Sequence, residues 1–259
     1  MTQKQFLNVN GLRLAYLDFG GDGPPLLAVH GHFGCGRMFA RLAEALRGQW
    51  RVIAPDLRGH GWSNAPEDYS REAYVADLAA LVDHLGLPPL VMLGHSLGGQ
   101  NTYVFAARHP DRVRAMIIED MSALVAPSTF QSIWPERFGS VAQVLDFLES
   151  EGMGRDPYFL ESLVEHPDGW GFRFKCENLI RSMRQGEGDW WADWLATSCP
   201  ALLLHGHQSR VLTTDHAREM AARRPNTQLV EFPNCGHTIH DDDPEGFYQA
   251  VRAFLDALA

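Results

Sequence analysis

The hydrophobic pattern along the chain predicts two kinds of strand. Apolar and polar residues alternate over residues 6–9 and 12–19, on either side of Asn10-Gly11, which is typical of a β-hairpin. Later runs are apolar almost throughout, as expected for parallel strands that are buried on both faces. These runs span residues 26–30, 51–55, 90–94, 113–118, 201–205 and 228–232.

Helical spacing separates most of these runs. Between residues 71 and 85, for example, apolar side chains recur every three or four positions. Because strands and helices alternate, we expect an α/β fold, with a mostly parallel β-sheet flanked by helices and joined by right-handed crossovers. The predicted helices span residues 36–46, 71–85, 101–109, 214–223 and 245–258.

The alternation stops between residues 122 and 198. Nothing in this segment predicts a buried strand, and helical spacing is confined to residues 141–151 and 177–184. We interpret the segment as a helical cap inserted into a core α/β domain, which divides the chain into residues 1–121, 122–198 and 199–259. Most of its aromatic residues are expected to pack the cap onto the core, and a minority to line an apolar substrate pocket. The aromatic residues are Phe130, Trp134, Phe138, Tyr158, Phe159, Trp170, Phe172, Phe174, Trp190, Trp191 and Trp194.

The charge and composition of the 259 residues exclude several classes of partner. The formal net charge of −10 argues against nucleic acid or an anionic membrane, and no apolar segment is long enough to cross a bilayer. The four cysteines are widely spaced and no signal-peptide pattern opens the chain, so we expect a reduced, cytoplasmic protein. No metal-ligand spacing or glycine-rich phosphate loop is evident, so we expect no cofactor and no metal. The expected partner is a small-molecule substrate, bound by a monomer or homodimer.

One motif stands between a predicted strand and a predicted helix. Gly94-x-Ser96-x-Gly98 matches the nucleophile elbow, in which a serine lies at a sharp strand-to-helix turn. Small residues are needed there because the backbone segments approach closely and the serine is strained. The turn would place Ser96 Oγ at the C-terminal edge of the sheet, and would aim the Leu97 N–H of the helix start at developing negative charge. We therefore predict Ser96 as a nucleophile.

A serine hydroxyl needs a base, and among the 12 histidines His237 is the best placed. It lies in the loop after residues 228–232, at the C-terminal edge of another predicted strand. His240 is less well placed, since it adjoins three aspartates that precede and cap the next helix. A second N–H for an oxyanion is expected from a glycine-rich turn, where the amide of His32 is the first choice and that of Phe33 the second.

Together these residues resemble the α/β-hydrolase superfamily, in the branch of small serine hydrolases with an inserted cap. The resemblance covers nearly the whole chain and implies the α/β-hydrolase fold with a serine nucleophile, a histidine base and an acid. It also implies a structural role for Asp56 and Arg58 in a connecting loop. It rests on His30-Gly31-His32-Phe33-Gly34, Asp56-Leu57-Arg58-Gly59-His60-Gly61-Trp62-Ser63, Gly94-His95-Ser96-Leu97-Gly98-Gly99 and Gly236-His237.

The position of the acid departs from the family's pattern. Most relatives carry it in the loop that here reads Gly206-His207-Gln208-Ser209-Arg210-Val211-Leu212, which holds no carboxylate. Asp215 follows in the first turn of a helix, where an acid is expected for capping alone. The strand next to the elbow strand ends in Glu119 and Asp120, and side-chain alternation allows only one of them to face His237. The resemblance favours Asp120, while Glu119, Asp215, a merely loop-tying Asp120 or no acid at all are the alternatives.

These assignments predict a serine hydrolase that cleaves a small to medium carboxylic ester through an acyl-enzyme. The residues expected to contact substrate are Phe33, His95, Trp134 and Phe138. A serine nucleophile argues against haloalkane dehalogenase and epoxide hydrolase relatives, which require an aspartate. A C–C bond or amide hydrolase of a ring-cleavage product, or a cofactor-free perhydrolase, would use the same residues. A non-catalytic ligand receptor is the alternative from another class, favoured only by the missing acid.

Overall fold

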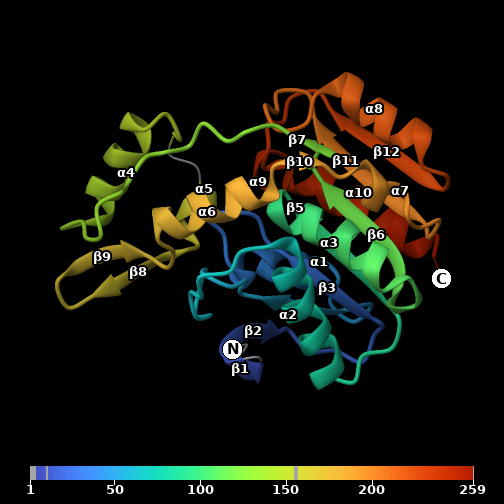
Figure 1. Ribbon diagram of the computed structural model, residues 1–259, viewed down its shortest axis with the longest axis horizontal. Helices are drawn as coiled ribbons and strands as arrows, with labels where there is room; N and C mark the ends of the chain where they lie inside the picture. Colours follow the sequence, from blue (N-terminus) through green and yellow to red (C-terminus); the bar gives the residue numbers. More distant parts are fainter. Residues whose placement is uncertain (1–3, 10, 155–156, 259) are drawn as a thin grey trace.

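A computed structural model describes residues 4–9, 11–154 and 157–258, and its centre is an eight-stranded sheet with helices on both faces (Figure 1). The strand order is β1-β2-β4-β3-β5-β6-β11-β12, and only the β1/β2 and β2/β4 pairs are antiparallel. Asn10, in the predicted hairpin turn, and residues 1–3 lie outside the described residues. The strands are β1 (Lys4–Val9), β2 (Leu12–Asp18), β3 (Pro25–Val29), β4 (Arg51–Pro55), β5 (Leu90–His95), β6 (Val113–Glu119), β11 (Ala201–Gly206) and β12 (Thr227–Phe232).

Helices cover both faces of this sheet and create two hydrophobic clusters. Successive strand residues point to opposite faces, so Leu27 of β3 belongs to the cluster that contains residues of the helices 71–84, 97–108 and 214–223, while Leu26 belongs to the cluster with residues of the helices 40–45 and 244–256. Because both faces are covered, the parallel strands need apolar residues at every position. No helix in the described part of the chain is long and apolar enough to span a membrane. The helices are η1 (Gly36–Phe39), α1 (Ala40–Ala45), α2 (Arg71–His84), α3 (Leu97–Arg108), η2 (Pro110–Arg112), α8 (Thr214–Arg223), α9 (Ile239–Asp242) and α10 (Pro244–Asp256).

The predicted α/β fold with a mostly parallel sheet is confirmed, with two changes at helix boundaries. α3 begins at Leu97, four residues before the predicted start, because Ser96 occupies its N-cap position and the following glycines accept helical geometry. The predicted helix over residues 36–46 is divided into a 3₁₀ turn and the short helix α1.

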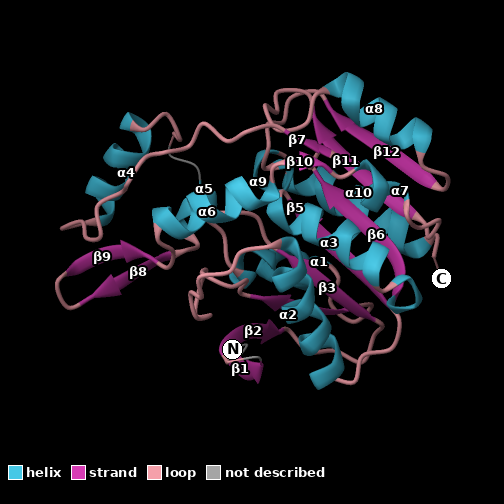
Figure 2. Ribbon diagram, viewed as in Figure 1, coloured by secondary structure: helices cyan, strands magenta, loops and turns pink. Residues whose placement is uncertain are grey.

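The insertion between β6 and β11 is less purely helical than predicted. α4 (Val141–Ser150) and α6 (Cys176–Gly186) match the two expected helices, and a β-hairpin of β8 (Leu163–His166) and β9 (Gly169–Phe172) lies between them, apart from the main sheet (Figure 2). These strands have four residues each and are mostly half-buried, so no continuous apolar run signals them. The shorter elements are β7 (Leu124–Val125), α5 (Pro157–Leu160), β10 (Gly188–Asp189) and α7 (Trp191–Leu195).

The aromatic residues of the insertion divide between two cores. A cluster centred on Trp134, Phe138 and Phe174 holds the insertion together and contacts the body of the protein through Phe33. Trp194, in α7, belongs instead to the main core, where its indole N–H donates to the backbone oxygen of Met220 at 3.0 Å. The last part of the insertion therefore packs as part of the α/β body.

Candidate active site

Ser96 lies at the sharp corner between β5 and α3, in a backbone conformation that L-residues rarely adopt (φ 53°, ψ −121°). A Cβ at Gly94 would lie 2.2 Å from the carbonyl oxygen of Gly98, and one at Gly98 would lie 1.9 Å from that of Val29. Only glycine fits at both positions, which explains the Gly-x-Ser-x-Gly spacing. The corner leaves Ser96 half-buried directly after the C-terminal end of β5.

A cavity of about 1000 Å³ opens beside Ser96, between the loops of the body and the insertion. His32, Phe33, Leu97 and His237 line it together with Ser96. The structure thus brings the predicted nucleophile, the predicted base and both oxyanion candidates to one space. The insertion supplies much of the apolar wall, through Val125, Phe130, Met153, Tyr158, Phe159 and Met183.

His237 is held by contacts on two sides. Its Nδ1 lies 2.8 Å from Asp120 Oδ2, and its carbonyl oxygen lies 3.0 Å from Nε2 of His95, the neighbour of Ser96. In the part of the chain that the structure describes, the Ser96 hydroxyl and the His237 imidazole are not hydrogen-bonded to each other. Such contacts often tighten only when substrate binds. The Nδ1 contact fixes the imidazole so that Nε2 remains for a second partner.

Asp120 is completely buried, and its carboxylate receives four hydrogen bonds. Oδ1 lies 3.2 Å from His205 Nδ1 and 3.2 Å from the Gly206 N–H, while Oδ2 accepts from His237 and from the Ser209 hydroxyl. Burial opposes ionisation, but the hydrogen bonds from His205, His237 and Ser209 outweigh it and lower the pKa of Asp120 below its usual value. The carboxylate is therefore ionised and fixed in position beside His237.

The two other candidate acids are placed elsewhere. Glu119 is also fully buried, but its Oε1 accepts from the backbone N–H and Nδ1 of His240, at 2.9 and 2.7 Å. Asp215 is an exposed residue in the first turn of α8. Of the three acids, only Asp120 touches His237.

The turn after β3 offers amides to the cavity and is held from behind by the insertion. In the described part of the chain the amides of His32, Phe33 and Leu97 have no hydrogen-bond acceptor, whereas the turn's carbonyls are engaged. Tyr158 Oη donates to the His32 oxygen at 2.5 Å, and the Ser162 hydroxyl donates to the Phe33 oxygen. These contacts orient the turn while leaving its amides open.

Of the four residues expected to contact substrate, one lines the cavity and three do not. Phe33 lines the cavity as expected, while His95 is buried beneath it and contacts the rings of His237 and His240. Trp134 and Phe138, also expected to contact substrate, do not line this cavity. Both are buried in the aromatic cluster of the insertion, where apolar packing satisfies them without a ligand.

Several residues of the site were not predicted from the sequence, namely Tyr158, Ser162, His205 and Ser209. Ser209 had a signal, because it stands where most relatives carry the acid and the structure uses its hydroxyl to contact Asp120. The hydrogen bonds of Tyr158 and Ser162 had no signal, because their partners lie 126 and 129 residues away in the chain. Tyr158 was expected only as one of the aromatic residues of the insertion that could line the pocket.

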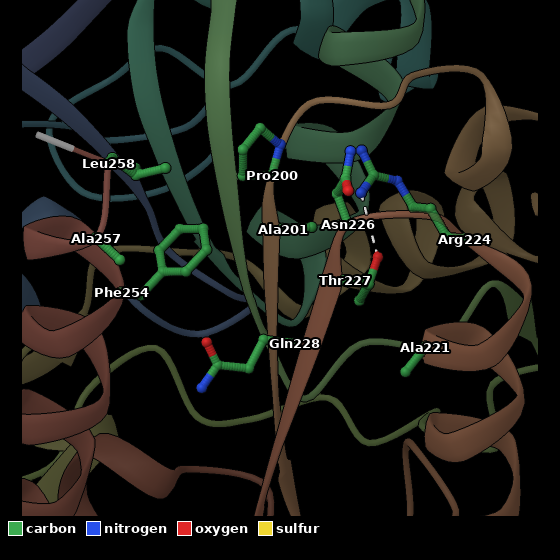
Figure 3. A pocket seen from close by; sticks show the side chains of 10 residues that line it. All are labelled: Pro200, Ala201, Ala221, Arg224, Asn226, Thr227, Gln228, Phe254, Ala257 and Leu258. Atoms are coloured by element: carbon green, nitrogen blue, oxygen red, sulfur yellow. Dashed lines mark hydrogen bonds between the residues drawn. The ribbon is translucent and has the colours of Figure 1, made fainter.

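A second hollow lies at the opposite end of β11 and β12 (Figure 3). Its charged residue, Arg224, is almost completely buried and already bonds to the carbonyl oxygens of Trp194 and Cys199 and the hydroxyl of Thr227. The charged group of this hollow is therefore already engaged by the protein itself. In the described residues no group of His, Cys, Asp or Glu side chains is arranged to hold a metal ion.

Three buried histidines make the fold sensitive to acid. Burial lowers the pKa of His30 to about 4 and those of His60 and His95 to about 3, whereas an unfolded chain protonates histidine near 6.5. The unfolded state therefore binds more protons below pH 6.5, so this stability is complete above that pH and is lost as the pH falls toward 4.

We expect the free energy of unfolding to fall by about 4 kcal/mol between pH 7.5 and 5.5, at about 1.4 kcal/mol for each of the three histidines. Urea unfolding at the two pH values measures it. Equal free energies of unfolding at both values would show that the three imidazoles are not held neutral by the native state.

The fold and the site together define a class: α/β proteins that carry a serine at a sharp turn between a strand and a helix, beside a cavity. A family model described as the α/β hydrolase fold matches residues 24–244. The chain belongs to this family, and the resemblance predicted from the motifs is confirmed.

Curated relatives and solved structures agree with this placement. The chain is 30% identical to the sn-1-specific diacylglycerol lipase ABHD11 of Mus musculus, over 94% of this chain and 85% of that one. It is 27% identical to the 2-(acetamidomethylene)succinate hydrolase of Mesorhizobium japonicum, over 92% and 90% of the two chains. An α/β hydrolase from Novosphingobium aromaticivorans superposes with a TM-score of 0.83 at 26% identity, over 98% of both chains. By family and by relatives, the protein is a hydrolase.

Proposed function

We propose that the protein is a serine hydrolase that cleaves a small to medium carboxylic ester through an acyl-enzyme. The observation that carries the proposal is the Asp120–His237 pair, at 2.8 Å, beside the cavity that Ser96 shares. A buried carboxylate that fixes an imidazole next to a serine at an elbow is the arrangement that activates a hydroxyl for acyl transfer.

In the first step Ser96 Oγ attacks the acyl carbon of the ester, and His237 Nε2 takes the hydroxyl proton. Asp120, which accepts from Nδ1, stabilises the imidazolium that forms. The negative oxygen of the tetrahedral intermediate is bound by the amides of Leu97 and His32, the first of which begins α3 and adds the favourable end of a helix dipole. The alcohol then leaves with the proton from His237.

In the second step a water molecule repeats the sequence on the acyl-enzyme. His237 takes a proton from the water, the hydroxide attacks the acyl carbon, and the tetrahedral intermediate returns to the same amides. Its collapse releases the carboxylic acid and restores the Ser96 hydroxyl with the proton from His237.

Further observations support an enzyme rather than a non-catalytic ligand receptor. The loop 206–212 lacks a carboxylate, but Asp120 reaches His237 from the neighbouring strand, so the absence in the loop no longer argues for an inactive site. The named activity of the mouse relative is that of a lipase. The apolar wall of the cavity is suited to an acyl or alcohol group of modest size.

Burst kinetics test this proposal. With p-nitrophenyl butyrate, p-nitrophenol should be released in a burst equal to the enzyme concentration if deacylation is the slower step. A fluorophosphonate should add one phosphonyl group, which peptide mass spectrometry should place on Ser96. No turnover of short esters combined with no labelling of Ser96 would rule the proposal out.

Tyr158→Phe tests the support of the oxyanion turn. Loss of the hydroxyl that donates to the His32 oxygen frees the turn, so kcat should fall about tenfold while KM stays within about twofold. The affinity for butylboronic acid, which becomes a tetrahedral anion on Ser96, should fall in parallel with kcat. Tyr248→Phe, on α10, is the matched control. A change in KM alone would assign Tyr158 to substrate binding.

A further inference from the structure

Arg210 lines the cavity beside Ser96. Of its lining residues in the described part of the chain, only Arg210 is a lysine or arginine. Arg210 makes no ion pair or hydrogen bond with any described residue, in contrast to arginines on the neighbouring elements, such as Arg218, which contacts Glu231, and Arg223, which contacts Glu219. Its guanidinium is exposed and free to bind a ligand in the cavity.

The backbone around Arg210 is held in place by the catalytic network. The Ser209 hydroxyl donates to Asp120 and accepts from the backbone N–H groups of Val211, at 3.0 Å, and Leu212, at 3.4 Å. Leu212 is itself completely buried in the main core. Arg210 is therefore fixed at its Cα while its long side chain keeps its freedom, one residue from a group that touches the Asp120 carboxylate.

Among the lining residues that the structure describes, Arg210 carries the permanent positive charge. Burial lowers the pKa of His32 well below its usual value, so that imidazole is neutral. Gln208 and Asn234, on the same side, are uncharged. The acidic residue of the lining, Asp242, has its Oδ2 engaged by the Gly236 N–H at 2.6 Å.

We propose that Arg210 binds a carboxylate carried by the ester substrate, at a distance from the scissile bond. The proposal rests on the proposed function. A single guanidinium, with its planar pair of N–H donors, matches one carboxylate. Asp242 also lines the cavity, so a doubly charged phosphate is a poorer match than a singly charged carboxylate. The substrate class is then an ester with an apolar portion against the insertion and a carboxylate toward the loop 206–212.

Two pairs of substrates test the proposal and locate the carboxylate. Mono-p-nitrophenyl glutarate is compared with its neutral methyl ester, p-nitrophenyl methyl glutarate, for a carboxylate on the acyl side. 4-Carboxyphenyl butyrate is compared with 4-acetylphenyl butyrate for a carboxylate on the alcohol side. Arg210→Gln should lower kcat/KM about tenfold for the anionic member of one pair, mainly through KM, and leave its neutral partner within about twofold.

Separate experiments control for the charge of Arg210 and for its position in the cavity. Arg210→Glu should lower kcat/KM for the anionic substrate further, and 0.5 M NaCl should reduce the difference between wild type and Arg210→Gln. Arg41→Gln removes an equally exposed charge from α1, outside the cavity, and should have no effect on either pair. An equal loss for charged and neutral esters in Arg210→Gln would overturn the proposal.

A binding measurement separates this proposal from the proposed function. Calorimetry on Ser96→Ala with mono-p-nitrophenyl glutarate needs no turnover, and adding Arg210→Gln should weaken binding about tenfold. Binding that is equally tight without Arg210 refutes the carboxylate contact even if the enzyme is an esterase. Weakened binding together with inactive wild type would refute the esterase and keep the contact.

Discussion

Replacing Ser96 with alanine is expected to lower kcat for p-nitrophenyl butyrate by about 10⁵-fold or more. The reason is chemical: without Oγ no acyl-enzyme forms, and His237 can only direct a water molecule at an ester held by the Leu97 and His32 amides. The burst of p-nitrophenol should disappear together with turnover. Stopped-flow absorbance measures both in one experiment.

The matched control for this loss is Ser150→Ala, which removes an exposed hydroxyl at the end of α4. It should turn over within about twofold of wild type. Ser96→Ala should also keep the unfolding midpoint of wild type within a few degrees, because the strained backbone at this corner tolerates alanine no worse than serine. Substantial turnover in a correctly folded Ser96→Ala protein would show that another group is the nucleophile.

The sheet was predictable because its signal is local. A strand buried on both faces must be apolar at successive positions, and Leu26 and Leu27 do enter two different cores. The signal of the sharp turn at Ser96 is local as well. Glycine is required at positions 94 and 98 because a Cβ there would lie only 2.2 and 1.9 Å from a backbone carbonyl oxygen, so the motif reports the corner directly.

The choice between the neighbouring acids Glu119 and Asp120 could be predicted only in part from the sequence. Side-chain alternation allowed only one of Glu119 and Asp120 to face His237. In the structure Asp120 contacts His237, and Glu119 contacts His240. Which acid takes which histidine depends on the path of the chain after β6, where Asp120 has a positive φ of 49°. Local pattern does not encode that path.

The insertion was harder to predict, because its aromatic residues either pack in a core or line the cavity, and the two roles give the same pattern in a sequence. Trp134 is buried against other rings, Trp194 belongs to the core of the body, and Phe159 lines the cavity. All are apolar positions without a strict period. Only tertiary packing distinguishes an aromatic residue that fills a core from one that meets a ligand.

The second large effect is expected from Asp120→Asn, which should lower kcat by about 10³- to 10⁴-fold. Asparagine keeps the size of the side chain, but its amide offers N–H groups as well as an oxygen. An amide N–H facing His237 would favour the tautomer that carries its proton on Nε2, where it cannot accept from Ser96. The imidazolium formed during attack also loses its negative partner. Steady-state kcat and circular dichroism together measure the loss in a folded protein.

Two substitutions of the other acids make this prediction specific. Asp215→Asn, exposed on α8, should leave kcat within about twofold of wild type. Glu119→Gln weakens the buried contact with His240 and should lower the unfolding temperature more than it lowers kcat. If Asp120→Asn keeps near-normal kcat while Asp215→Asn or Glu119→Gln loses it, the orienting acid is one of those residues. The four hydrogen bonds to Asp120 would then serve only to join the end of β6 to β11 and to the loops after β11 and β12.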